Sequence, residues 1–214
     1  MATVSFDAWL PEVLPLVPEC PDTIAINAIR NSCIDFCLQT NWWQGDYGTT
    51  AITTAILPYA FVLDTGVAMA QVMVATLSSN GRPLVITDID TLDSRVINWR
   101  AETGEPRAIF QPTPGVVDFY PRPAGTDSYN IFMRIAYAPL RSATTVDDTV
   151  YEAWQEEIAA GALSRLMMIP NKVWTNADGA TQYGNMFKAA KVQGAIETSK
   201  SYGRGSQQIQ MRRI

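Results

Sequence analysis

Small and apolar residues recur at three- and four-residue spacing through PDTIAINAIRNSCIDFCLQT, the stretch from Pro21 to Thr40. This spacing places them on one face of a helix. Only Ile29 and Phe36 give the face bulk, so a second helix can approach closely. Pro21 suits a first helical turn, and Asp22 suits the positive end of the helix dipole. We predict a central helix here, packed against another helix more than a hundred residues later.

Helical spacing returns in the last third of the chain. A second long helix is predicted to open at Asp147 or Asp148 and to close before Pro170. Residues 159–162, AAGA, make its middle as slender as the face of the first helix. A third helix is predicted over Ala177 to Thr198. The early turns of the second helix carry three acidic residues, which the helix dipole favours there: Glu152, Glu156 and Glu157.

Between these helices the period becomes strand-like. The turn sequence Ser78-Ser79-Asn80-Gly81 separates two of the strands, and a short helix is predicted around Thr91–Val96 with Asp90 as its cap. The segments favour a small antiparallel sandwich or barrel of five to seven strands. The predicted strands are Ala51–Leu57, Ala70–Leu77, Leu84–Thr87, Arg107–Gln111, Val116–Tyr120 and Tyr129–Tyr137.

Together these elements predict an α+β fold. A helical bundle, made of the N-terminal helix and a C-terminal helix pair, carries an inserted small antiparallel β-sandwich or barrel and an extended C-terminal tail. The predicted bounds are residues 1–46 and 140–198 for the bundle, 47–139 for the inserted β domain and 199–214 for the tail. With 214 residues, 47% of them hydrophobic, the chain can bury a sizeable core.

Charge divides the chain into an acidic body and a basic end. The net charge of the whole chain is −5. From Asn171 onward there are seven basic and two acidic residues, so this end has a net charge of +5 and the rest of the chain −10. The two ends are therefore expected to meet different partners. The tail has no clear helical or strand period, and its apolar residues interleave with its positive charges. These features favour docking into a protein groove; nucleic-acid binding and a plain disordered terminus are the alternatives.

Few residues in the chain suggest catalysis. The absence of histidine removes the commonest general base and metal ligand. Asp88, Asp90 and Asp93 in DIDTLD are either a fragment of a calcium loop or solvated turn carboxylates; the central Gly and closing Glu of such a loop are missing. No catalytic, metal or cofactor site is predicted.

The three cysteines and the apolar stretches indicate in which cellular compartment the chain is expected to fold. Cys33 and Cys37 share the apolar helix face, so both are expected to be buried free thiols, and Cys20 has no cysteine left to pair with. Free thiols of this kind suit a reducing compartment. No signal peptide is expected, because the first residues do not form a basic start followed by an apolar run. Residues 55–77 are apolar but interrupted by polar residues and proline, so strands are expected there and not a membrane span.

Four segments, in order, resemble a known family. VPECPDTIAINAIRNSCIDFCLQTNWW resembles the N-terminal helix signature of head-to-tail adaptor, or connector, proteins of tailed bacteriophages. NGRPL resembles their turn between sheet strands, and INWRAETGEPRAIFQPTPGVVDFYPRPAG resembles their W…GxP…lyPxP pattern. YEAWQEEIAAGALSRLMMIPNKVWTNADGATQYGNMFKAAK resembles their C-terminal helix pair, so the resemblance covers residues 4–195.

The resemblance implies a structural protein of the virion neck, assembled in the host cytoplasm, and not an enzyme. Such adaptors form a ring, usually of about twelve copies, beneath the portal protein. The ring extends the channel for double-stranded DNA without specific binding, and offers a platform to the next tail or nozzle protein. No membrane partner is implied. The bundle docks on the portal, and these tail residues are expected to reach a portal groove: Lys200, Tyr202, Arg204, Ile209, Met211, Arg212, Arg213 and Ile214.

An acidic body suits a channel wall, because it repels DNA phosphates. Glu152, Glu156 and Glu157 are the candidates to line the bore. Three alternatives stay open: a tail-completion or terminator ring, a metal-dependent phage hydrolase that uses the DIDTLD carboxylates, and a cytoplasmic β-sheet binding module with helical flanks.

Overall fold

The long helices form where the apolar spacing predicts them. A computed structural model describes residues 2–199 and contains α2 (Asp22–Thr40), α4 (Asp148–Met167) and α5 (Ala177–Ser199). Asp147 caps α4 by accepting a hydrogen bond of 3.0 Å from the backbone N–H of Thr149. Asn41, in the left-handed conformation, ends α2 and donates its backbone N–H to the carbonyl of Cys37.

The three helices pack against one another through small residues. Phe36 on α2 lies 4.8 Å from Trp154 on α4, measured between ring centroids. A Cβ atom at Gly194 on α5 would come within 3.0 Å of the Phe36 ring, and one at Gly161 on α4 within 2.9 Å of the Phe187 ring. The predicted contact between the first and second long helices is therefore confirmed.

The first residues of the chain complete this helical end of the molecule. Strand β1 (Thr3–Ser5) pairs antiparallel with β10 (Thr145–Asp147), which leads directly into α4. Three short turns of helix follow β1: η1 (Phe6–Trp9), α1 (Leu10–Val13) and η2 (Leu14–Leu16). Of these, η1 packs against α2, α1 packs against both α2 and α4, and η2 packs against α1.

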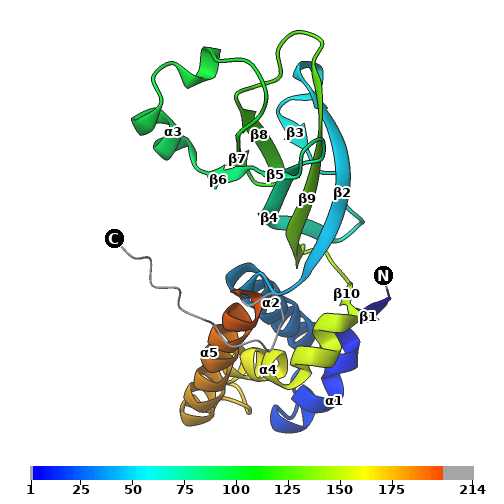
Figure 1. The fold of residues 1–214 in the computed structure, drawn as a ribbon. Coiled ribbons are helices and arrows are strands. Elements are labelled where there is room, and N and C mark those ends of the chain that lie inside the picture. Colours follow the sequence, from blue (N-terminus) through cyan, green and yellow to red (C-terminus); the bar gives the residue numbers. More distant parts are fainter. Residues whose placement is uncertain (1, 200–214) are drawn as a thin grey trace.

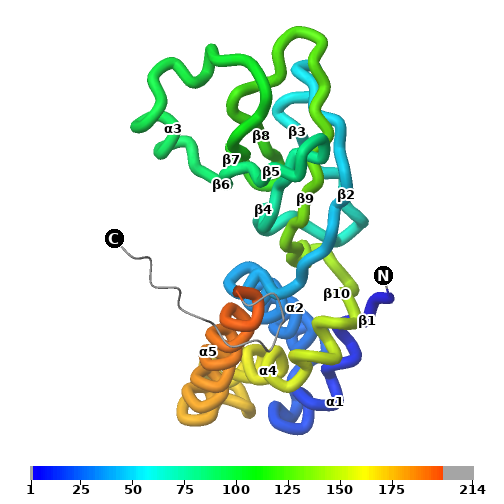
Figure 2. The backbone as a smooth tube through the Cα atoms, viewed as in Figure 1, coloured from blue at the N-terminus to red at the C-terminus, as the bar shows by residue number. Residues whose placement is uncertain are grey.

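The remaining strands form the opposite, sheet end of the molecule (Figure 1). Figure 2 shows that the chain leaves the helical end through β2 and returns through β9. The first sheet has the order β2 (Gln44–Thr53), β9 (Ser128–Pro139), β4 (Val67–Leu77), β5 (Arg82–Pro83). The second has the order β3 (Tyr59–Ala60), β8 (Val116–Tyr120), β7 (Ala108–Thr113), β6 (Val85–Thr87).

The segment between β6 and β7 is a crossover. It contains α3 (Ile89–Arg95) and η4 (Trp99–Ala101), and it allows β6 to run parallel to β7. Asp88 caps α3, in place of the predicted Asp90, because its carboxylate accepts the backbone N–H of Thr91 at 2.7 Å. Leu92, Trp99 and Phe110 form a small core of their own under this crossover.

The predicted fold class, a helical bundle with an inserted antiparallel sandwich or barrel, is wrong. Residues 2–199 form a mixed α+β structure with five α-helices, several short 3-10 turns and three sheets. One sheet, β1–β10, belongs to the helical end, and another contains the parallel pair β6–β7. Alternation along a strand shows neither its partner nor its direction, and strands of three residues are too short to reveal a period. Independent folding of residues 47–139 stays a prediction.

Candidate partner interface

The acidic residues on α4 lie around an irregular turn. Glu152 and Glu156 are exposed, and Glu157 is half-buried. Between them, Trp154 departs from helical geometry with φ −136° and ψ 24°. The indole N–H of Trp9 donates to the backbone carbonyl of Gln155 at 3.1 Å, so α4 is tied at its bend to the N-terminal segment. The direction of the first turn, which carries Glu152, is therefore set by packing.

Glu12 on α1 joins these residues, and no sequence pattern singles it out beyond its being an acidic residue after Pro11. The Gln155 side chain donates to the Glu12 carboxylate. Burial, and then the negative charge of Glu156, raise the pKa of Glu12. Glu12 is therefore close to Glu156 although the two are far apart in sequence. We call the surface formed by Glu12, Glu152 and Glu156 the acidic side.

A carboxylate on α2 joins all three long helices. Asp35 accepts from Arg165 on α4 and from Lys191 on α5, both at 3.2 Å. The Lys191 ammonium also lies 4.8 Å from the centroid of the Phe187 ring, and its side chain is only 16% exposed. Because this ion pair is sheltered from solvent, it fixes α5 against α2 more firmly than a surface pair would.

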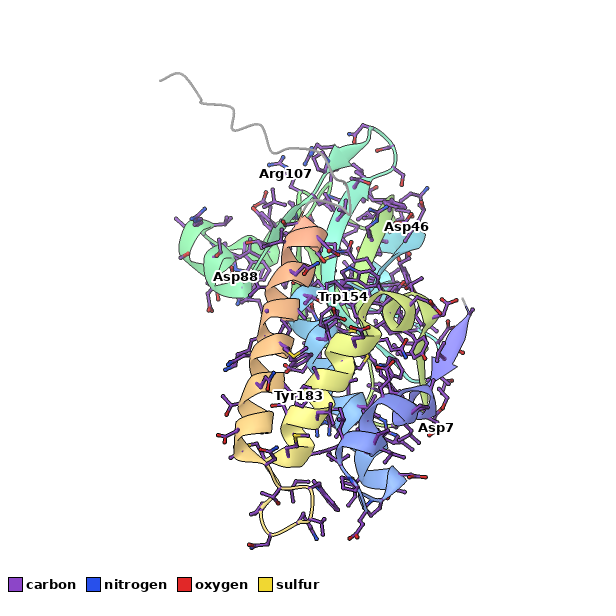
Figure 3. All side chains as sticks on the ribbon, turned by 90° about the horizontal axis from the view of Figure 1, so that it is seen from below. Asp7, Asp46, Asp88, Arg107, Trp154 and Tyr183 are labelled. Atoms are coloured by element: carbon purple, nitrogen blue, oxygen red, sulfur yellow. The ribbon has the colours of Figure 1, made fainter. Side chains whose placement is uncertain are left out.

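One side of α5 carries exposed aliphatic residues and no charged residue of its own, although the Gln193 side chain on it donates to the neighbouring Glu197 carboxylate at 3.1 Å. Met186, Val192 and Ile196 are exposed, with Ala189 and Gln193 between them. Figure 3 shows Tyr183 on the inner side of the same helix, toward α4. We call Met186, Ala189, Val192, Gln193 and Ile196 the uncharged side of α5. Surfaces that are poor in charge and carry exposed aliphatic side chains are typical of contacts with other proteins.

The eight tail residues expected to contact the portal lie outside the described residues. The structure does show where this tail begins. The indole N–H of Trp42, at the start of the chain's path into β2, is 3.4 Å from the carboxylate of Glu197. α5 therefore ends beside the junction of the helical end and the sheet end.

The carboxylates of DIDTLD stabilise the crossover. The Asp88 carboxylate accepts hydrogen bonds from the hydroxyl and then the backbone N–H of Thr91, and these lower the pKa of Asp88. Asp93 accepts the Trp99 indole N–H at 2.7 Å and pairs with Arg100, whose hydrogen bond lowers the pKa of Asp93. Within residues 2–199, no group of three or more acidic or cysteine residues could hold a metal ion. These contacts give no support to a metal-dependent hydrolase.

The thiols lie inside the helical end. Cys33 and Cys37 are buried and free, as predicted, and Cys20 is also buried and free. A hydrogen bond with Cys37, together with complete burial, raises the pKa of Cys33 well above its ordinary value. These thiols therefore pack the core as small apolar groups. None of the helices in the described part of the chain has the length and apolar character needed to cross a bilayer.

Comparison with known proteins agrees with the resemblance noted in the sequence. The family model of the SU10 adaptor protein matches residues 8–209, which include the helical end, the sheet end and most of the tail. A comparison with curated proteins gives no match. Because the family model covers nearly the whole chain, the chain belongs to the SU10 adaptor protein family, the head-to-tail adaptors of bacteriophages.

Proposed function

We propose that copies of this chain form a ring of about twelve subunits beneath the portal, which extends the DNA channel toward the tail. The family match over residues 8–209 is the observation that carries this proposal. In this role the tail residues anchor the ring to the portal, and the sheet end is the platform for the next tail protein. The protein acts by position and shape, as a structural component of the neck.

The surfaces of the helical end suit a ring. Head-to-tail contacts in a ring need two different patches on each subunit, and the uncharged side of α5 is our candidate for one of them. Figure 1 places α5 and α1 on opposite sides of the helical end. The uncharged side of α5 is suited to contact with protein, whereas the acidic side on α1 and α4 is suited to face DNA.

Association with the portal tests the proposed role. Purified chain mixed with portal rings should co-sediment with them in a gradient, with about one adaptor per portal subunit. A binding module of another kind would stay monomeric and would sediment apart from the portal. That second result would contradict the proposal.

The bore is tested by reversing charge on the acidic side. Replacing Glu152 and Glu156 with Lys should make assembled rings retain double-stranded DNA about tenfold or more tightly at low salt, with the retention lost at high salt. The matched control is Asp90→Lys with Asp127→Lys, two exposed positions on the sheet end. Equal retention by both pairs would place the acidic side outside the bore.

A further inference from the structure

A small cavity lies where the start of β2, the end of β9 and the segment before β4 meet. Its volume is about 190 Å³, below the range of about 300–1,000 Å³ that is usual for small-molecule sites, so it suits a single long side chain. We call it the aromatic cavity. Three aromatic residues, two carboxylates and three aliphatic residues line it: Trp43, Tyr47, Tyr137, Asp46, Asp64, Val62, Leu63 and Val67.

The rings and carboxylates of this lining suit a cation. The Trp43 and Tyr137 rings lie 5.4 Å apart, measured between centroids. Burial, and then the negative charges of Asp46 and Asp64, raise the pKa of Tyr137, so both carboxylates lie near its hydroxyl. Asp46 already pairs with Arg134 at 2.7 Å, whereas the Asp64 side chain has no hydrogen bond or ion pair within residues 2–199. A guanidinium can stack on aromatic faces and pair with a carboxylate at the same time, so arginine fits this lining best.

The wall of the aromatic cavity also holds an unpaired donor. Trp43 is only 7% exposed, and its indole N–H has no hydrogen-bond partner within residues 2–199. The Tyr47 hydroxyl, in contrast, shares a hydrogen bond of 3.0 Å with that of Tyr59 and accepts the backbone N–H of Val62 at 3.3 Å. The second bond holds Val62 at the rim, where its side chain is 83% exposed. A buried donor without an acceptor costs free energy, so the cavity is incomplete in a single chain.

The crossover between β6 and β7 presents complementary groups. Arg95 is exposed in the last turn of α3 and has no carboxylate partner in the described part of the chain. Ile97 follows the end of α3 and precedes Asn98, which has φ 57°; its side chain is 92% exposed. Figures 1 and 3 place α3, with its cap Asp88, on the side of the sheet end opposite to β2 and Asp46. Arg95 and Ile97 therefore cannot reach the aromatic cavity of their own chain.

We propose that, in the ring, the crossover of each copy docks at the aromatic cavity of the next copy. Arg95 of the crossover enters the cavity beside Asp64, and Ile97 packs on Val62 at the rim. The inference rests on the proposed function, because a ring of head-to-tail contacts brings opposite sides of neighbouring copies together. Each closed contact gives the free carboxylate a cation and covers two exposed aliphatic side chains.

A cysteine pair tests the contact in the full-length chain bound to portal rings. Val62→Cys combined with Ile97→Cys should link copies under mild oxidation into dimers, trimers and a ladder of higher species, because each copy carries both halves of the contact. Val62→Cys combined with Val173→Cys is the matched control and should link much more slowly, since Val173 is equally open to solvent but lies at the helical end. Equal linking of the two pairs, no linking, or linking that stops at the dimer would each overturn the proposal.

Charge reversal tests the role of the arginine. Adding Arg95→Glu to the linking pair should slow ladder formation about tenfold or more, and adding Asp64→Arg as well should restore it. Arg107→Glu is the matched control, because Arg107 is also exposed at the sheet end without a carboxylate partner among residues 2–199, and it should leave the rate unchanged. An effect of Arg95→Glu no larger than that of Arg107→Glu, or a failure of Asp64→Arg to restore linking, would reject the contact.

Portal binding separates this contact from the proposed function. Co-sedimentation of the unmodified chain with portal rings is measured alongside, and the linking assay is repeated on the free chain at high concentration. Full co-sedimentation without a ladder would overturn the contact alone. A ladder from a chain that does not co-sediment would support the contact and count against the proposed function.

Discussion

Removing residues 200–214 is expected to abolish co-sedimentation of the chain with portal rings. The segment carries four positive charges with interleaved apolar residues, and we propose that it becomes ordered on the portal. The deletion leaves α5 complete, together with the contacts of Asp35 with Arg165 and Lys191. The thermal melting temperature should therefore change little while binding is lost.

A tail of the same length made of Gly and Ser is the control for that deletion. It should fail to bind as the deletion does, because it lacks both the charges and the apolar anchors. Portal binding that persists in either variant would show that the anchor lies elsewhere, and the uncharged side of α5 would then be the next surface to change.

Replacing Phe36 with Ala should lower the free energy of unfolding by about 3–5 kcal/mol. The Phe36 side chain is fully buried, and its ring contacts Trp154 and the backbone of α5 at Gly194. The substitution would leave a cavity where three helices meet, so the surrounding side chains can fill it only in part. The loss of unfolding free energy should therefore reach the upper part of that range. Urea denaturation followed by fluorescence or circular dichroism measures it.

Leu38→Ala is the matched control on the same helix. Leu38 is 52% exposed, so its truncation should change the free energy of unfolding by about 0.5 kcal/mol or less. Equal losses in the two variants would mean that the packing of α2 against α4 and α5 does not hold the helical end together.

The long helices could be predicted because their period extends over five turns or more. The face containing Cys33 and Phe36 is buried as expected. The sheet end was harder, since most strands were located to within a few residues but their partners were not. Nothing in the residues of β6 and β7 indicates a parallel pair.

The candidate site was predictable in part for similar reasons. Exposure of Glu152 and Glu156 follows from their positions in an amphipathic helix. Glu12 could not be found, because its place beside Glu156 depends on how η1 and α1 pack against the irregular turn at Trp154. The contacts of the Asp93 carboxylate with the Trp99 indole and the Arg100 guanidinium likewise depend on the path of the crossover. No local sequence pattern shows that path.

Electron microscopy of the purified portal complex is the decisive test of the proposed ring. We expect a collar of about twelve copies under the portal, with the helical ends toward the portal and Glu152 and Glu156 toward the bore. Density for the portal without a collar, or a collar whose bore is lined mainly by lysine and arginine, would contradict it.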